Sequence, residues 1–237
     1  EQGQPIQIND HILQIENEYY SPIRPKQIPR NDETPAQALQ KRGVAYIELR
    51  AVDINPYSDI GIDISTACFL EVLALYNLLQ DSPEISDTEQ DAIDRNMAKI
   101  VDDGRKSNLM IETRLGEQRF KDWARLQLDQ MQAVAKLLDQ SVAQPIYQKS
   151  LQVMGKRLEH GEQALSAQVL SDTVAANGSW HFGHALATKY AAQHAAQQLE
   201  ANTQQYLQQT VEQSLQAQQQ LEQQSDIDFK SYLARYR

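Results

Sequence analysis

The sequence is poor in the residues on which several classes of protein depend. Only one of its 237 residues is a cysteine, Cys68, which excludes an intrachain disulfide and a zinc-thiolate site and fits a reducing, cytoplasmic compartment. No apolar run is long enough to span a bilayer, and no basic-then-apolar leader begins the chain, so we expect no membrane partner. Positive charge is also scarce: 22 Lys and Arg face 32 Asp and Glu, for a net charge of -10. That balance argues against a nucleic-acid partner and favours small molecules or proteins.

The chain has few glycines, and its prolines are almost confined to the first quarter. The 9 glycines form no Walker loop, no dinucleotide fingerprint and no nucleophile elbow, so any nucleotide chemistry needs another phosphate-binding design. Of the 8 prolines, only Pro83 and Pro145 lie beyond the first quarter of the chain. Because proline interrupts helices, this distribution predicts strands and loops in the first quarter and helices in the remainder.

Two segments of the first quarter alternate between apolar and polar side chains, as strands of an antiparallel sheet do. They are residues 12–20 and residues 45–53. Between them, the sequence TPAQALQKRG predicts a short helix, with Thr34 as its cap, Pro35 in its first turn and Gly43 at its end. The first quarter is therefore predicted to hold strands and loops around one helix.

The rest of the chain shows the 3.6-residue spacing of amphipathic helices. The predicted helices cover residues 64–80, 88–103, 117–139, 143–159, 162–175 and 181–224. The last is rich in glutamine and has a thin apolar stripe, so we expect a long, partly exposed arm. The predicted fold class is α+β and predominantly α-helical, with the strands of an antiparallel sheet in residues 1–62 and a helical region in residues 63–237.

The two predicted strands each carry a row of polar side chains. Glu16, Glu18 and Tyr20 share one side of the first, and Glu48 and Arg50 share one side of the second, because residues two apart on a strand face the same way. Carboxylates are the ligands that magnesium prefers, and a guanidinium grips a phosphate through two parallel hydrogen bonds. The pattern fits a metal-phosphate site. It also fits the solvated face of an antiparallel sheet, so spacing alone leaves both interpretations open.

Further candidates carry less information. In SPIRPK, two prolines stiffen an extended segment that presents Arg24 and Lys26, which suits anion capture but also an ordinary solvated loop. His181 and His184 have the spacing of a shared metal site on a helix, but no third ligand lies nearby in the sequence, so we expect no metal there. Cys68 falls within a helical apolar pattern and is expected as a buried small hydrophobe rather than a nucleophile.

Two longer stretches show a family resemblance. LQIENEYYSPIRPK and GVAYIELRAVDINPYSDIGID closely resemble the bacterial glutamate-cysteine ligase (gamma-glutamylcysteine synthetase) family of the enterobacterial type, including its YIE-x-R strand at residues 46–50. The match is strongest over residues 8–63, and weaker similarity continues in GRK at residues 104–106, in LSAQVL near residue 165 and in the ending DFKSYLARYR. The resemblance implies that the chain is the C-terminal half of such a protein and that its strands belong to a glutamine-synthetase-like catalytic sheet.

The resemblance also implies a reaction. This family joins the gamma-carboxylate of L-glutamate to the amine of L-cysteine in the first step of glutathione biosynthesis, using ATP and Mg2+ and a gamma-glutamyl phosphate intermediate. Such a site neutralises phosphate charge while it excludes water. By resemblance, Glu48 is a magnesium ligand, Arg50 is the catalytic contact to the transferred phosphate, and Tyr20 belongs to the cysteine-binding pocket.

Five other residues match the family motif, and their individual duties are less defined. Asn17, Arg24 and Lys26 are expected as contacts to the nucleotide or its phosphates, with a structural role as the alternative for the two cations. Glu16 and Glu18 are expected to line the site.

The resemblance further implies a missing partner, the N-terminal half of the same protein. That half supplies more strands of the sheet, further carboxylate metal ligands and the residues that hold both amino acids. Because a site without most of its surrounding groups is not preorganised, we expect this polypeptide to be inactive alone. Two alternatives stay open: a non-catalytic helical interaction module, and a ligase of the same fold that joins glutamate to a different amine.

Overall fold

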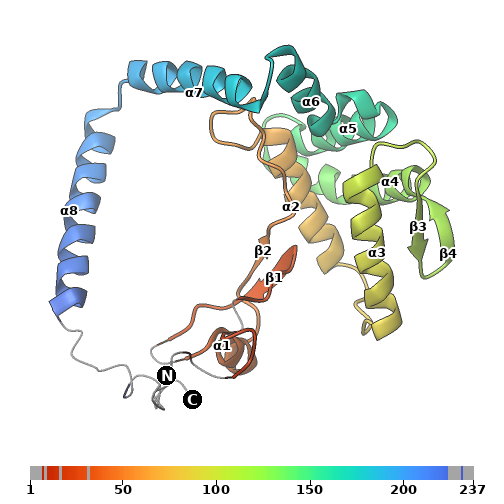
Figure 1. Ribbon diagram of the computed structural model, residues 1–237, viewed down its shortest axis with the longest axis horizontal. Helices are drawn as coiled ribbons and strands as arrows, with labels where there is room; N and C mark the ends of the chain where they lie inside the picture. Colours follow the sequence, from red (N-terminus) through yellow and green to blue (C-terminus); the bar gives the residue numbers. More distant parts are fainter. Residues whose placement is uncertain (1–6, 8–9, 16–17, 31–32, 224–230, 232–237) are drawn as a thin grey trace. The chain divides into compact units, whose positions relative to one another are not determined.

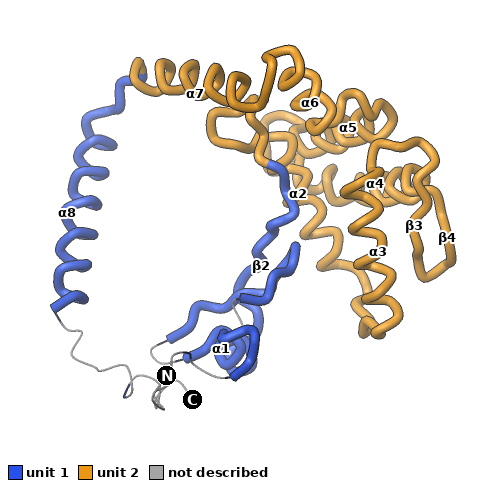
Figure 2. Tube along the Cα trace, in the orientation of Figure 1, with its two compact units in different colours: residues 1–53, 197–237 blue, residues 54–196 orange. Residues whose placement is uncertain are grey.

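The computed structural model describes residues 7, 10–15, 18–30, 33–223 and 231 (Figure 1). It divides into two compact units, residues 1–53 with 197–237 and residues 54–196, which are coloured separately in Figure 2. The helices are α1 (Pro35–Arg42), α2 (Ile64–Leu78), α3 (Asp87–Asp103), α4 (Phe120–Leu138), α5 (Ile146–Glu159), α6 (Leu165–Ala175), α7 (Ser179–Ala196) and α8 (Ala201–Gln223). The strands are β1 (Ile23–Lys26), β2 (Tyr46–Leu49), β3 (Met110–Thr113) and β4 (Gly116–Arg119). The predicted α+β, predominantly helical class is confirmed.

The first unit contains an antiparallel pair, β1 and β2, and the helix α1 between them in sequence. Register pairs Ile23 with Leu49 and Lys26 with Tyr46. The pairing is closed at its two ends by backbone hydrogen bonds from Arg50 to Pro22, 2.7 Å, and from Ala45 to Lys26, 2.8 Å. The alternation predicted for residues 45–53 is confirmed over the shorter strand β2, where Tyr46 and Glu48 share one face and Ile47 and Leu49 the other. Residues 50–53 are not part of the strand.

The partner strand is not the predicted one. Residues 10–15 form bends, and the strand lies instead in the proline-containing segment of β1. Local hydrogen bonds explain the difference: the Glu18 amide donates to the Ile15 carbonyl, 3.1 Å, and the Glu18 carboxylate accepts from the Gln14 amide, 2.8 Å. A side chain that satisfies a nearby backbone donor competes with a strand ladder. Proline is tolerated in β1 because an edge strand does not need every N–H.

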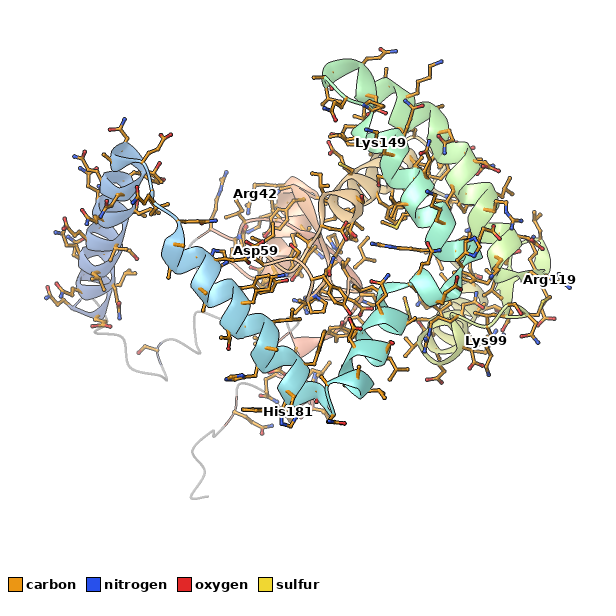
Figure 3. The ribbon with its side chains drawn as sticks, turned by 90° about the horizontal axis from the view of Figure 1, so that it is seen from above. Arg42, Asp59, Lys99, Arg119, Lys149 and His181 are labelled. Carbon is orange, nitrogen blue, oxygen red and sulfur yellow. The ribbon has the colours of Figure 1, made fainter. Side chains whose placement is uncertain are left out.

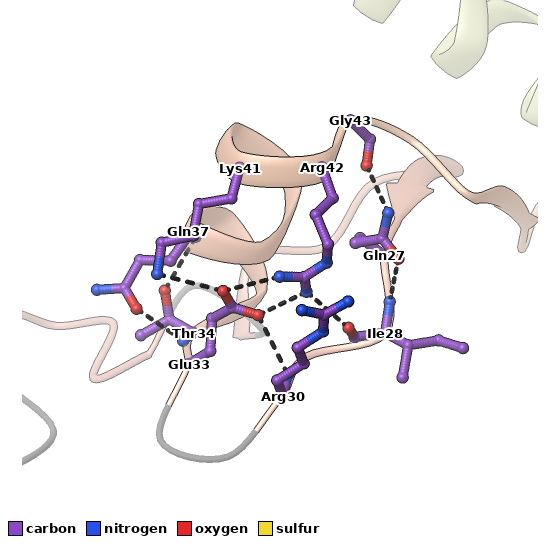
Figure 4. Close-up of polar contacts among 9 residues, drawn as sticks. All are labelled: Gln27, Ile28, Arg30, Glu33, Thr34, Gln37, Lys41, Arg42 and Gly43. Atoms are coloured by element: carbon purple, nitrogen blue, oxygen red, sulfur yellow. Dashed lines mark hydrogen bonds and ion pairs between the residues drawn. The ribbon is translucent and has the colours of Figure 1, made fainter.

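Helix α1 begins and ends as predicted. The Thr34 hydroxyl accepts from the Gln37 amide, the Gln37 side chain accepts from the Thr34 amide, and Pro35 occupies the first turn. Gly43 follows the helix with φ 72°, a conformation that favours glycine, and its amide donates to the Leu39 carbonyl. Figure 4 shows the capping residues and the loop that leads into the helix.

The second unit is built on three mutually packed helices, α2, α4 and α5, of which α4 is the longest at 19 residues. Its core consists of Val72, Tyr76, Met131, Ala135 and Leu151. Burial of such side chains contributes roughly 1.5–3 kcal/mol each and is the main source of stability here. Helices α2, α4 and α5 are therefore stabilised by the packing of their apolar faces against one another.

A β-hairpin in the second unit was not predicted. Strands β3 and β4 pair antiparallel, and the turn between them closes at Gly116, whose φ is 100°. The hairpin takes residues 117–119 from the start of the helix predicted at 117–139, so α4 begins at Phe120. Four-residue strands are too short to give a clear alternating pattern in sequence, which explains the omission.

The predicted helix at 181–224 is two helices. α7 ends at Ala196 and α8 begins at Ala201, although residues 197–200 contain neither glycine nor proline to indicate a break. Every residue of α8 is exposed, as predicted for the glutamine-rich arm, and Figure 3 shows its side chains extending outward along its length. None of the described helices is long and apolar enough to cross a membrane.

Candidate functional site

The candidate site is the charged face of the β1–β2 pair. Arg24 is the register partner of Glu48, and Lys26 is the register partner of Tyr46. Because partners in an antiparallel pair share a face, these four side chains lie on one side of the pair, and Arg50 follows at the end of β2 on the same side. Two strands from separate motifs are thus needed to assemble the face.

Glu48 is the centre of this face. Its carboxylate accepts hydrogen bonds from Arg50 Nε, 2.9 Å, and Arg50 Nη2, 3.2 Å, and forms an ion pair with Lys26 Nζ at 3.0 Å. The Arg50 guanidinium first and the Lys26 ammonium second lower the pKa of Glu48 to about 2. The carboxylate is therefore ionised and held by two cations, while about a third of its side chain, 34%, stays exposed.

Tyr20 joins the same cluster. The Arg50 guanidinium carbon lies 5.8 Å from the centre of the Tyr20 ring, within the range of a cation–π contact. The structure therefore brings together Tyr20, Lys26, Glu48 and Arg50. The phenol is 65% exposed, which leaves it accessible to a ligand on this side.

Two of the other predicted site residues, Arg24 and Glu18, lie among the described residues. Arg24 is on the charged face by register. Glu18 uses its carboxylate for the local bond to the Gln14 amide. Glu16 and Asn17 lie outside the described residues.

Sequence reasoning did not single out Tyr46 as a site residue, although period-two alternation places it on the same side of β2 as Glu48. It is 52% exposed on the charged face. The period-two alternation was the signal that could have identified it.

The charged face can supply only some of the ligands that a magnesium ion requires. Mg2+ takes oxygen ligands, commonly one or two carboxylates together with phosphate oxygens and water. Glu48 offers one partly exposed carboxylate, so it fits as one ligand once Arg50 and Lys26 turn to another anion. Among the residues that the structure describes, no three or more His, Cys, Asp or Glu side chains form a group able to hold a metal.

The two histidines of α7 pack against an aromatic ring. Trp180 stacks on His184 with ring centres 4.8 Å apart and meets His181 edge-on at 5.3 Å. The two histidines therefore contact a ring of their own helix. Cys68 is buried as predicted, and burial raises the pKa of its thiol, so it is a poor nucleophile.

Comparison with known proteins gives one consistent result. The family model for glutamate-cysteine ligase matches residues 1–100. The glutamate-cysteine ligase of Pseudomonas fluorescens is 40% identical over 169 residues, which covers 71% of this chain and 32% of that protein. The enzyme of Aliivibrio salmonicida is 36% identical over 187 residues, which covers 78% of this chain and 36% of that protein. The chain thus spans about a third of the length of these curated relatives.

Solved structures agree. A glutamate-cysteine ligase from Francisella tularensis in complex with AMP superposes with a TM-score of 0.87 at 32% identity, covering 99% of this chain and 46% of that one. A bifunctional glutathione synthetase from Pasteurella multocida superposes with a TM-score of 0.55 at 21% identity over 75% of this chain, which supports the fold alone. With the family motif on β2 and its charged face in view, the chain is similar to glutamate-cysteine ligases, over residues 1–100 by the family model and over 99% of its length to the Francisella tularensis structure.

Proposed function

We propose that the charged face of β1 and β2 is part of a site that joins the gamma-carboxylate of L-glutamate to the amine of L-cysteine, with ATP and Mg2+, through gamma-glutamyl phosphate. The observation that carries the proposal is the cluster of Glu48, Arg50, Lys26 and Tyr20 on one face, in a chain similar to glutamate-cysteine ligases. The Francisella tularensis relative, which superposes on nearly the whole chain, was solved in complex with AMP, and this supports a nucleotide as co-substrate.

The chemistry of the reaction explains the choice of side chains. A carboxylate is a poor electrophile until it is phosphorylated, and phosphoryl transfer depends on positioning and on neutralising negative charge. Arg50 is proposed to hold the transferred phosphate through the fork of its guanidinium, which already makes two parallel bonds to a carboxylate here. Lys26 and Arg24 are proposed to neutralise the remaining phosphates.

Glu48 is proposed as the magnesium ligand of this chain. The ion, when bound, neutralises phosphate charge and orients the phosphate oxygens. The depressed pKa of Glu48 keeps its carboxylate in the ionised form that a cation requires. Tyr20 is proposed to form a wall of the cysteine pocket, where a phenol offers both an apolar ring and a hydrogen bond.

The opposite face of the strand pair supports a partner. Ile23, Ile47 and Leu49 are register neighbours on that face and are 52%, 46% and 37% exposed. A two-stranded pair with an uncovered aliphatic face is marginally stable in water. We infer that the remaining part of a family protein, the N-terminal half in the enterobacterial type, covers this face, and that this chain corresponds to the C-terminal half. Without that part the chain is expected to be inactive, and a cytoplasmic location fits its single cysteine.

The test is a chimera of the Francisella tularensis ligase in which the matching segment is replaced by this chain. With ATP, Mg2+, L-glutamate and L-cysteine, we expect the chimera to release ADP continuously and this chain alone to release none. Monodisperse elution and a cooperative thermal transition establish that the chimera is folded. A folded chimera without cysteine-dependent ADP release would contradict the proposal. Faster ADP release with another amine than with cysteine would identify a ligase of different acceptor specificity.

A further inference from the structure

An apolar pocket of about 390 Å³ lies between α2, α4 and α5 in the second unit. All three helices contribute to its walls, among them Phe69 of α2, Phe120 of α4 and Met154 of α5. Its volume falls within the range of roughly 300–1,000 Å³ that is typical of pockets for small molecules. The proposed ligation assigns no role to these residues, so the pocket needs an explanation of its own.

The walls of the pocket are held in place by contacts within the protein. The Tyr76 hydroxyl donates to the Gln130 side chain, 2.5 Å. The rings of Phe120 and Trp123 are stacked, with centres 6.4 Å apart and an interplanar angle of 28°. Met131 lines the pocket and also belongs to the core of this unit, where it is 3% exposed. A wall that is fixed before binding costs a ligand little ordering entropy.

The described side chains that line the pocket carry no charge, although 23% of the residues of the chain are charged. An ion that leaves water without a partner pays a desolvation penalty of several kcal/mol, so the lining selects against a charged ligand. The aromatic rings and the thioethers of Met131 and Met154 favour a flat, polarisable body. The ligand that matches this lining is therefore uncharged and aromatic.

Two polar groups of α4 line the pocket one helical turn apart. Trp123 carries an indole N–H and Gln127 an amide, and residues four apart lie on the same face of a helix. Both side chains are half-buried, and within the described part of the chain neither makes a hydrogen bond. Because an indole N–H only donates, the group that satisfies it is a hydrogen-bond acceptor. The pocket therefore favours a ligand that carries an acceptor atom.

The depth of the lining distinguishes a small molecule from a protein partner. Each apolar side chain that lines the pocket is buried or half-buried, so the pocket is a recess between helices. A docking surface for another protein would present apolar side chains that stand exposed around it. A recess of this kind favours a molecule small enough to enter it.

The geometry points to this pocket as a binding site for a small, uncharged, planar aromatic molecule that carries one hydrogen-bond acceptor. The rings and thioethers of the lining contact its aromatic body, and the Trp123 indole N–H and the Gln127 amide donate to its acceptor. The inference does not rest on the proposed function, because it uses none of the residues assigned to the ligation. Its failure and the failure of the proposed function are therefore separate results.

The experiment compares three probes of the same shape with the purified full chain at neutral pH. Quinoline is uncharged and has a ring-nitrogen acceptor, naphthalene has no acceptor, and N-methylquinolinium is a cation. Saturation-transfer NMR detects binding, and titration followed by the protein spectrum gives the dissociation constants.

Three variants locate the binding. Ala124→Phe fills the pocket, and Trp123→Phe keeps an aromatic ring but removes the indole donor. Ala133→Phe is the matched control, because Ala133 is exposed on the same helix and does not line the pocket. Circular dichroism shows whether each variant keeps the helical content of the parent chain.

We expect quinoline to bind about 2–10-fold more tightly than naphthalene, which is the effect of one net hydrogen bond, and N-methylquinolinium to give no signal. Ala124→Phe weakens quinoline at least about tenfold, while Ala133→Phe leaves its affinity within about twofold of the parent. Trp123→Phe removes the preference for quinoline over naphthalene.

Three results would overturn the inference: no quinoline signal from the parent chain, equal quinoline affinity in Ala124→Phe and Ala133→Phe, or binding of N-methylquinolinium as tight as that of quinoline. If Ala124→Phe loses its helical content, an unchanged preference for quinoline in Trp123→Phe would overturn it instead. A quinoline signal from this chain but none from the folded chimera would mean that the remaining part of a family protein covers the pocket, which also contradicts the inference.

Discussion

Two carboxylates in different regions of the chain have nearly the same ionic surroundings. Glu48 on β2 is bound by two nitrogens of Arg50, Nε and Nη2, and by Lys26. Glu112 on β3 is bound by two nitrogens of Arg95, at 3.0 and 2.6 Å, and by Lys99 at 3.4 Å. The pKa of each is lowered to about 2, chiefly by its arginine. Their side chains are 34% and 32% exposed.

The two differ in what their contacts join. Arg95 lies on α3, so its bonds to Glu112 fasten that helix to the hairpin. The Asn96 side chain adds two bonds to the Glu112 backbone, 2.7 and 2.9 Å. Arg50 is only two residues from Glu48 on the same stretch of chain, so their pair adds no tertiary contact.

This difference separates a structural ion pair from a candidate site. Hydrogen bonds that join distant elements stabilise the fold, whereas the pair of Glu48 and Arg50 lies within one short stretch of chain and is joined only to Lys26 of the adjacent strand. Strong ionic pairing and a depressed pKa occur at both carboxylates, so neither property identifies a functional site. What distinguishes the two carboxylates is which elements of the fold their contacts join.

The largest expected effect is on catalysis. In the chimera, Arg50→Gln removes the group that faces the transferred phosphate, and loss of one such charge-stabilising donor lowers kcat by about 100–1000-fold. Arg95→Gln is the matched control, because Arg95 binds Glu112 in the same bidentate way. Steady-state ADP release measures both. Equal kcat in the two variants would remove the functional distinction between the two carboxylates.

The next effect is on the pKa of Glu48. Arg50→Gln removes the largest cause of its depression, so we expect the pKa to rise from about 2 toward 4.5, while that of Glu112 stays near 2. A depressed pKa means that the ion pair stabilises the folded chain above pH 4.5, the ordinary value, and that this contribution is lost as the pH falls through 2. Carbon-detected NMR of the two carboxyl groups in this chain gives the midpoints. A Glu48 midpoint that does not move would show that the Arg50 contact is absent in solution.

The smallest effect concerns the strands that carry the two carboxylates. Ile111, next to Glu112, is 4% exposed, whereas Ile47, next to Glu48, is 46% exposed. Ile111→Val is expected to lower the free energy of unfolding by about 0.5–1.5 kcal/mol, and Ile47→Val by less than about 0.5 kcal/mol in this chain. Urea denaturation of the two variants provides the comparison. A larger loss for Ile47→Val would mean that the aliphatic face of β1 and β2 is already covered in this chain.

Local signals in the sequence were sufficient to locate most of the helices, although not the break at residues 197–200 or the start of α4. Thr34, Pro35 and Gly43 mark the ends of α1 because caps depend on nearby residues, and the apolar spacing over residues 64–80 predicts α2, whose buried residues include Val72 and Tyr76. Pairing between distant segments was not predictable in this way. The partner of β2 lies in a segment whose prolines favour a loop, and the bends before it depend on hydrogen bonds of Glu18.

The same limit applies to the site. Period-two alternation places Glu48 and Arg50 together, and the family resemblance supplies their roles. The ion pair between Lys26 and Glu48 depends on the pairing of β1 with β2, and the apolar pocket depends on how α2, α4 and α5 pack. The spacing of residues along the sequence predicts neither the contact between Lys26 and Glu48 nor the pocket.

The most direct test of the account is the rate of ADP release by two variants of the chimera, Glu48→Gln and Glu112→Gln, at saturating ATP, Mg2+, L-glutamate and L-cysteine. Both substitutions remove a carboxylate that binds an arginine and a lysine, but only Glu48 is proposed to contact the magnesium ion of the site. The account predicts a loss of about 100-fold or more for Glu48→Gln and a rate within about twofold of the parent for Glu112→Gln. A folded Glu48→Gln chimera with the parental rate would contradict it.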